Sequence, residues 1–192
     1  MLLAPTCPGC GAEGAAPCPR CLASMAAPPQ PPCGGPLVSC EALLAYEGPA
    51  REVVVRLKYR NARASLRWLA AGMANLVAAE AVDVVTWAPT SAARRHARGF
   101  DQAELLAREV ARRCALPCRH LLGRGPGPPQ TGRTAEQRAV GPSFAVRRSV
   151  TGLSVLIVDD VITTGATVRS AASALVDAGA REVRALAAAH PP

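Results

Sequence analysis

Four cysteines in two close pairs stand near the start of the chain. Pro-Gly separates Cys7 from Cys10, Pro-Arg separates Cys18 from Cys21, and seven residues lie between the pairs. Each pair can place two thiolates on one tight turn, and two such turns supply the four sulfur ligands that tetrahedral zinc prefers. A redox dithiol is the alternative, but that motif is normally a single pair. Because the segment has few apolar residues, the spacing predicts a structural zinc ion.

Two further cysteines, Cys33 and Cys40, lack this paired spacing, and we interpret them as ordinary thiols. Residues 26–36 are rich in proline and show no periodicity, which is typical of an extended linker. We therefore expect a cysteine-rich module with its linker over residues 1–40, and a second domain over residues 41–192.

A second group of reactive side chains follows the apolar run from Ser154 to Val158. Two acids, Asp159 and Asp160, come directly after it, and a Thr/Gly loop then leads into a helical pattern. Loop amides and a helix N-terminus can hold a phosphate, whereas paired acids suit sugar hydroxyls or a Mg²⁺ ion. A helix cap after a buried strand is the alternative, but it explains only one acid. The pattern predicts a sugar-phosphate site with the loop Thr163, Thr164, Gly165, Ala166 and Thr167.

Apolar periodicity predicts the elements that position these groups. Helical spacing predicts two helices before Glu80, a helical stripe over residues 103–114, and a helix over residues 167–178 ending at Gly179. We read the segment from Gly123 to Gly132 as a loop. Strands are expected over residues 82–88, 154–158 and 183–188, the second being apolar enough for the centre of a parallel sheet. Alternating strands and helices predict an α/β fold with a parallel sheet.

The chain is basic, with 22 Lys and Arg against 14 Asp and Glu and a net charge of +8. This balance favours anionic partners. The arginines at positions 56 to 67 recur every three or four residues, and along one helix they would line one face that could contact the phosphates of single-stranded nucleic acid. A solvated helix face is the alternative. The stripe consists of Arg56, Arg60, Arg63 and Arg67. A separate basic cluster consists of Arg94, Arg95, His96 and Arg98.

The remaining patterns exclude several classes of protein. The three histidines, His96, His120 and His190, are scattered, so we interpret them as surface residues and find no support for Ser/His/Asp catalysis. No apolar run reaches the roughly 18 residues that span a bilayer, and the first residues do not follow a signal-peptide pattern. We therefore expect a cytoplasmic protein without membrane insertion.

The stretch from Val155 to Thr167 resembles the phosphoribosyl pyrophosphate (PRPP) signature of type I phosphoribosyltransferases. With the cysteine pairs, the segment Arg-Gly-Phe-Asp-Gln-Ala-Glu-Leu-Leu at 98–106 and the Gln- and Arg-containing loop at 130–144, nearly the whole chain resembles the competence protein F (ComF) family. The resemblance implies an α/β fold in which a type I phosphoribosyltransferase-like domain follows a small zinc-binding module.

The resemblance also implies roles for individual residues. Asp159 and Asp160 would contact the ribose hydroxyls of PRPP, and the loop at 163–167 would surround its 5′-phosphate. Mg²⁺ would bind together with PRPP, and residues 123–140 would form a loop that excludes water. The pyrophosphate side would be formed by Pro89, Thr90, Ser91, Arg94, Arg95 and Arg98.

Two functions follow from this resemblance. The protein would transfer the phosphoribosyl group of PRPP, or use another ribose 5-phosphate, with an unidentified acceptor and a role in DNA uptake. Alternatively, it would bind single-stranded DNA together with the competence machinery and keep the nucleotide site only as a sensor. The sequence departs from the family at Asp101, where asparagine is usual, and it lacks the asparagine expected shortly before Phe144.

Overall fold

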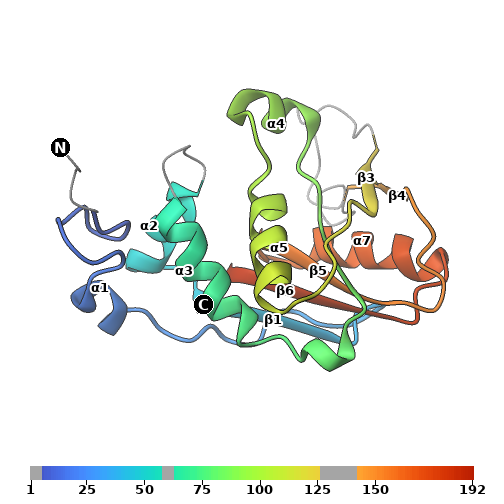
Figure 1. Ribbon diagram of the computed structural model, residues 1–192, viewed down its shortest axis with the longest axis horizontal. Helices are drawn as coiled ribbons and strands as arrows, with labels where there is room; N and C mark the ends of the chain where they lie inside the picture. The colour runs from blue at the N-terminus through green and yellow to red at the C-terminus, as the bar shows by residue number, and fades with distance from the viewer. Residues whose placement is uncertain (1–5, 58–62, 126–141) are drawn as a thin grey trace.

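The computed structural model describes residues 6–57, 63–125 and 142–192, and a four-stranded parallel sheet forms its centre (Figure 1). The strand order is β1-β6-β5-β2, and every neighbouring pair is parallel. The first five residues of β5 are buried, and this strand lies inside the sheet, which confirms the predicted central strand. The strands are β1 (Ser39–Ala45), β2 (Val84–Trp87), β5 (Ser154–Val161) and β6 (Glu182–His190).

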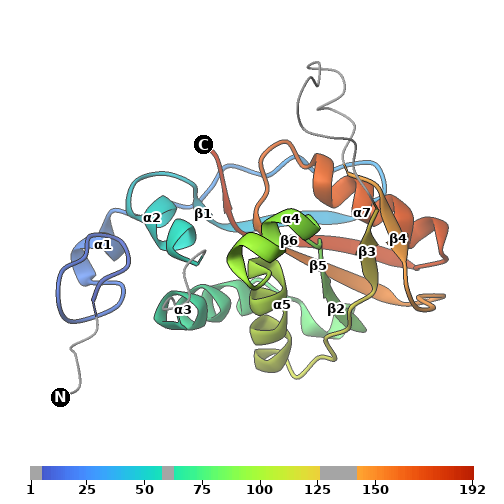
Figure 2. The same cartoon turned by 90° about the horizontal axis from the view of Figure 1, so that it is seen from above.

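Helices cover both faces of the sheet (Figure 2). On one face pack α2 (Gly48–Arg56), α3 (Arg63–Ala74) and α5 (Gln102–Arg113), and on the other packs α7 (Ala166–Asp177). Side chains alternate along β5, so Leu156 joins the core on the first face and Ile157 joins the core on the second. Burying a side chain of this size stabilises the fold by about 1.5–3 kcal/mol. The sheet therefore provides a rigid base whose strand ends can carry a site.

The smaller elements are α1 (Pro19–Ala23), a 3₁₀ turn at Ala79–Ala81, α4 (Ala92–Arg98), and the antiparallel pair β3 (Leu122–Arg124) and β4 (Phe144–Val146). The pair β3–β4 lies beside α7 (Figure 1). The prediction of a loop from Gly123 onward is wrong at its start, because Gly123 and Arg124 pair with β4. Residues 126–132 of that segment lie outside the described residues.

The expected arginine stripe does not lie on one helix. Helix α2 ends at Arg56, where Leu57 N–H donates to Val54 O at 3.1 Å in a tighter turn, and α3 begins at Arg63. Arg56 therefore belongs to a different helix from Arg67, and the prediction of a shared face is wrong, whereas the two helices predicted from apolar spacing are confirmed. Arg60 lies outside the described residues.

Two of the histidines predicted to be surface residues are half-buried and have partners inside the fold. The ring of His120 stacks on Trp87 with 4.8 Å between centroids, and His190 Nδ1 lies 2.7 Å from Ile162 O. His96 is exposed, as predicted. Among the described residues, no helix is both long and apolar enough to cross a membrane.

Candidate functional site

A pocket of about 410 Å³ lies at the carboxyl edge of the sheet. Tyr46 directly follows β1, Ala88 directly follows β2, and Asp159, Asp160 and Val161 end β5. In α/β folds this edge is where ligands bind. The other lining residues come from the segments before and within α4 and α5, from β3, and from the β5–α7 connection and the first turn of α7: Thr90, Arg94, Arg98, Asp101, Gln102, Ala103, Arg124, Thr163 and Thr167.

The two predicted acids form one wall of this pocket. Asp160 N–H donates to Asp159 Oδ1 at 2.8 Å, and Val161 N–H donates to Asp160 Oδ1 at 2.8 Å. These bonds hold both carboxylates against the end of β5. Burial and the neighbouring charge of Asp160 raise the pKa of Asp159 well above its usual value. Two carboxyl groups this close together can accept hydrogen bonds from hydroxyl groups and, when ionised, can bind a divalent cation.

The predicted phosphate loop lies beside the acids and lines a smaller cavity of about 30 Å³. Gly165 precedes α7 with φ +74°, a left-handed conformation that favours glycine. A Cβ built on Gly165 would lie 2.5 Å from Arg169 Nη1 and 3.2 Å from Pro32 O, so the linker and α7 close over this residue. The structure thus brings the acids and the loop Thr163 to Thr167 together at one strand end.

Another part of the pocket lining is basic, with Arg94, Arg98 and Arg124. Its loop at residues 89–91 is held from two sides, because Thr90 N–H donates to Asp101 Oδ2 at 2.8 Å and Arg124 Nη1 donates to Pro89 O at 3.2 Å. Of the residues predicted for this side, Thr90, Arg94 and Arg98 line the pocket. Pro89, Ser91 and Arg95 are not among its lining residues; Ser91 Oγ instead accepts from Arg94 N–H at the start of α4.

Asp101 joins the loop at 89–91 to α5. Its Oδ1 accepts from Ala103 N–H at 3.1 Å and caps α5, while its Oδ2 accepts from Thr90 N–H. Burial raises the pKa of Asp101, although nearby backbone N–H groups oppose that shift. Among the lining residues not predicted from the sequence are Tyr46, Gln102 and Arg124. Gln102 lies within the quoted segment at 98–106, whereas nothing local to Tyr46 or Arg124 indicates a pocket.

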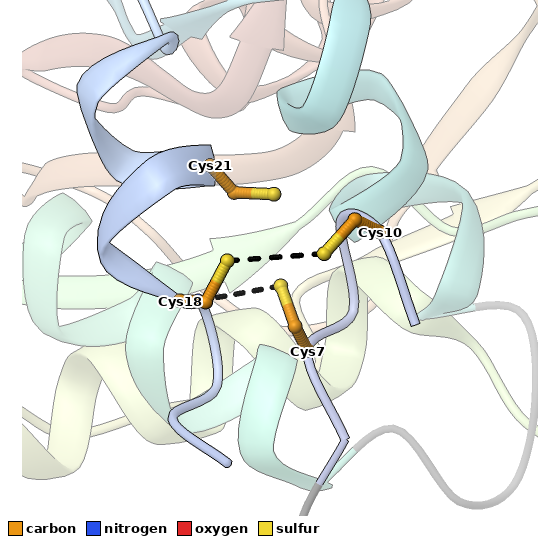
Figure 3. Close-up of side chains that lie close together, drawn as sticks. All are labelled: Cys7, Cys10, Cys18 and Cys21. Atoms are coloured by element: carbon orange, nitrogen blue, oxygen red, sulfur yellow. Dashed lines mark hydrogen bonds between the residues drawn. The ribbon is translucent and has the colours of Figure 1, made fainter. Parts of the chain in front are cut away.

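The four paired cysteines form a second candidate site (Figure 3). Helix α1, which carries Cys21, lies at the far end of the molecule from β3 and β4 (Figure 1). All four Sγ atoms lie within 4.8 Å of one another, and the Sγ atoms of Cys10 and Cys18 are 3.8 Å apart. A disulfide needs about 2.05 Å between sulfurs. A tetrahedron with Zn–S bonds of about 2.3 Å has edges of about 3.8 Å, so this arrangement fits four thiolates around zinc.

The backbone around this cluster favours thiolate at one of its members. Burial raises the pKa of Cys7, but N–H groups of Cys18, Cys10 and Gly9 outweigh burial and lower that pKa to about 6. Burial and neighbouring thiols raise the pKa of Cys21 to about 12. A divalent cation would balance such a group of sulfurs. Cys33 and Cys40 do not belong to the cluster. Cys40 lies within β1 and is buried in the core that also contains α7, and Cys33 Sγ lies 3.6 Å from Leu37 O.

The chain is similar to known proteins in sequence and in structure. The phosphoribosyl transferase domain family model matches residues 101–192. Among solved structures, the chain is 23% identical to the allosteric regulatory enzyme of purine biosynthesis, with a TM-score of 0.48, over 69% of this chain and 30% of that enzyme. For purine phosphoribosyltransferase from Pyrococcus horikoshii Ot3, the identity is 16% and the TM-score 0.43, over 65% of this chain and 72% of the other.

The similarity in sequence extends over almost the whole chain in two other proteins. DNA utilization protein YhgH from Salmonella typhimurium and its counterpart of the same name from Salmonella typhi are each 30% identical over 196 residues, covering 93% of this chain and 81% of theirs. Together with the phosphoribosyl transferase match and the cluster of four cysteines, this similarity shows that the chain belongs to the ComF family.

Proposed function

We propose that the pocket at the carboxyl edge of the sheet binds PRPP, or another ribose 5-phosphate, and that the protein transfers the phosphoribosyl group to an acceptor. One observation carries this proposal. Paired acids and a phosphate-type loop lie at the end of β5, and arginines from α4 line the same 410 Å³ pocket. A ligand with hydroxyl groups between two anionic groups fits this pocket, because the acids can accept from the hydroxyls while the loop and the arginines can bind the anionic groups.

Each wall has a distinct task in this proposal. Asp159 and Asp160 accept hydrogen bonds from the ribose hydroxyls, and the loop at 163–167 holds the 5′-phosphate near the N-terminus of α7. Arg94 and Arg98 offset the charge of pyrophosphate. Mg²⁺ bound with PRPP supplies further charge neutralisation on the leaving group.

The reaction needs no side-chain nucleophile. The bond between the anomeric carbon and pyrophosphate breaks, and its electron pair leaves with pyrophosphate. A lone pair of the acceptor forms the new bond, and the acceptor's proton passes to solvent. Catalysis then consists of positioning and electrostatic stabilisation by the two walls. Screening nucleobases for pyrophosphate release tests which acceptor is used.

Calorimetric titration with PRPP and Mg²⁺ tests the binding step. The double variant Asp159→Asn plus Asp160→Asn should lose PRPP binding, because both hydroxyl acceptors lose their charge. The matched control is Glu80→Gln plus Asp177→Asn, which removes two exposed acids outside the pocket. Equal affinity in both double variants would place the ligand elsewhere.

A second function is favoured by the relatives, which are named DNA utilization proteins. In this function the protein holds single-stranded DNA through exposed arginines such as Arg95 and Arg67, and the pocket serves as a sensor of ribose phosphates. Fluorescence anisotropy with short single strands separates the two functions. A sensor that does not catalyse transfer should bind DNA and PRPP without releasing pyrophosphate for any acceptor.

We also propose that Cys7, Cys10, Cys18 and Cys21 hold a structural zinc ion, supported by their mutual sulfur distances. In this proposal residues 1–40 form a metal-stabilised module with its linker, and residues 41–192 form the phosphoribosyltransferase-like domain. Zinc would close the short segment around α1, which has one buried residue in its helix, Cys21 itself.

A further inference from the structure

Gln102, the first residue of α5, lines the pocket but has no part in the proposed reaction as described by the acids, the loop and the arginines. Only 3% of its surface is accessible. Its Oε1 accepts from Arg98 Nη1 at 3.1 Å, whereas its Nε2 has no hydrogen-bond partner among the residues that the structure describes. A buried amide donor without an acceptor is costly and rare in native proteins.

Arg98 fixes the orientation of the Gln102 side-chain amide. A guanidinium group carries only donors, so it pairs with Oε1 and would lose this bond if the amide turned over. Nε2 is therefore held as a donor. Nε2 can therefore donate to a ligand oxygen without first breaking a hydrogen bond to another described residue.

The neighbouring backbone donor is already in use. Thr90 N–H, in the loop expected to face pyrophosphate, donates to Asp101 Oδ2 at 2.8 Å. The other carboxylate oxygen of Asp101 is bonded to Ala103 N–H. Thus the loop amide serves the protein's own carboxylate, while the Gln102 donor beside Arg98 is unpaired among the described residues.

We infer that Gln102 is an anion-binding residue, whose Nε2 donates to an oxygen of the pyrophosphate group of PRPP while Arg98 offsets its charge. This inference rests on the proposed function. It assigns the recognition of pyrophosphate to side chains at the corner of α4 and α5, with Thr90 N–H remaining on Asp101. Gln102 then distinguishes a pyrophosphorylated ribose from a ribose monophosphate.

Two substitutions test this role. Gln102→Glu keeps an oxygen for Arg98 but replaces the donor by a negatively charged acceptor, and Gln102→Met removes the donor without adding charge. We expect the affinities for PRPP with Mg²⁺ and for inorganic pyrophosphate to fall by ~10-fold or more, the typical effect of a hydrogen bond to a charged group. The affinity for ribose 5-phosphate should change by less than ~2-fold in Gln102→Met, because that ligand lacks the pyrophosphate.

The control is Arg112→Gln, which changes the net charge by the same amount as Gln102→Glu on an exposed part of α5 outside the pocket. It should leave all three affinities unchanged. Equal losses for PRPP and ribose 5-phosphate, or a lower melting temperature with unchanged affinities, would mean that Gln102 is only structural and would overturn the inference. If the unaltered protein binds pyrophosphate but not ribose 5-phosphate or PRPP, the proposed function fails instead.

Discussion

Replacing Gly165 by alanine tests how closely the backbone of the phosphate loop is packed. Gly165 has φ +74°, and an added Cβ would lie 2.5 Å from Arg169 Nη1 and 3.2 Å from Pro32 O. The arginine end can move aside, but the Pro32 carbonyl belongs to the backbone. The variant therefore combines conformational strain with a steric conflict against the linker.

Both contributions can be estimated. A left-handed conformation costs an alanine about 1–2 kcal/mol, and the contact with Pro32 adds an overpacking cost of about 1–2 kcal/mol. Gly165→Ala should thus lower the free energy of unfolding by about 2–4 kcal/mol, or the melting temperature by roughly 5–15 °C for a chain of this size. Gly152→Ala is a matched control, because Gly152 has the same φ of +74° with nothing within 4 Å of its Cβ.

The assay combines thermal unfolding with titration of ribose 5-phosphate. Gly152→Ala should cost only the conformational part, about 1–2 kcal/mol, and should keep the affinity of the parent. Gly165→Ala should be less stable than this control. It should also bind ribose 5-phosphate more weakly, because its methyl group takes up space beside the backbone that is proposed to hold the 5′-phosphate. If the two variants are equally stable and bind equally well, close packing at Gly165 is not part of the site.

Three other perturbations have defined outcomes. Elemental analysis should show that Cys18→Ser loses zinc while the control Cys33→Ser keeps one ion per chain. Clearly less than one zinc ion per chain in the unaltered protein would contradict the metal site. Asp159→Asn should raise the melting temperature at neutral pH. Burial and the adjacent carboxylate raise the pKa of Asp159 in the folded state, so the free energy of unfolding of the unaltered protein falls as the pH rises above the usual pKa of 3.8. The stability advantage of the variant should therefore disappear below pH 3.8. An increase in melting temperature that does not vary with pH would refute this cause. Replacing Arg67 and Arg95 together by alanine should reduce the salt slope of single-stranded DNA binding by up to ~1.4, whereas an unchanged slope would exclude both from the interface.

Local patterns predicted the groups whose members are close in sequence. The cysteine pairs gather as their spacing predicts, and the acids and phosphate loop lie within nine residues, 159–167, at a single strand end. Tyr46 and Arg124 reach the same pocket from distant parts of the chain, because the strand order and the β3–β4 pair place them there. No local pattern encodes that topology, so these residues could not be assigned beforehand.

Some elements could not be predicted from their own residues, because their composition favours another structure or shows no apolar periodicity. The sequence of β1, Ser-Cys-Glu-Ala-Leu-Leu-Ala, is rich in residues that favour helices, yet pairing with β6 makes it a strand. Helix α4 does carry signals, since Ser91 caps its start and Gly99 ends it with φ +78°, but its seven residues have no buried face to produce a periodicity. The prediction that the arginines share one helix face was wrong because the spacing of charges does not reveal a break between two helices.

The position of β1 at the sheet edge constrains the order in which the chain can fold during synthesis. Its neighbour in the sheet is β6, and Ser39 pairs with Arg184, about 145 residues later. At about 5–20 residues per second, a ribosome needs roughly 7–30 s to make that interval. The cysteine cluster, complete by Cys21, can close long before then, whereas β1 must wait for the last strand. A nascent chain stalled before β6 should therefore already form the proposed zinc site while β1 remains open to proteolysis.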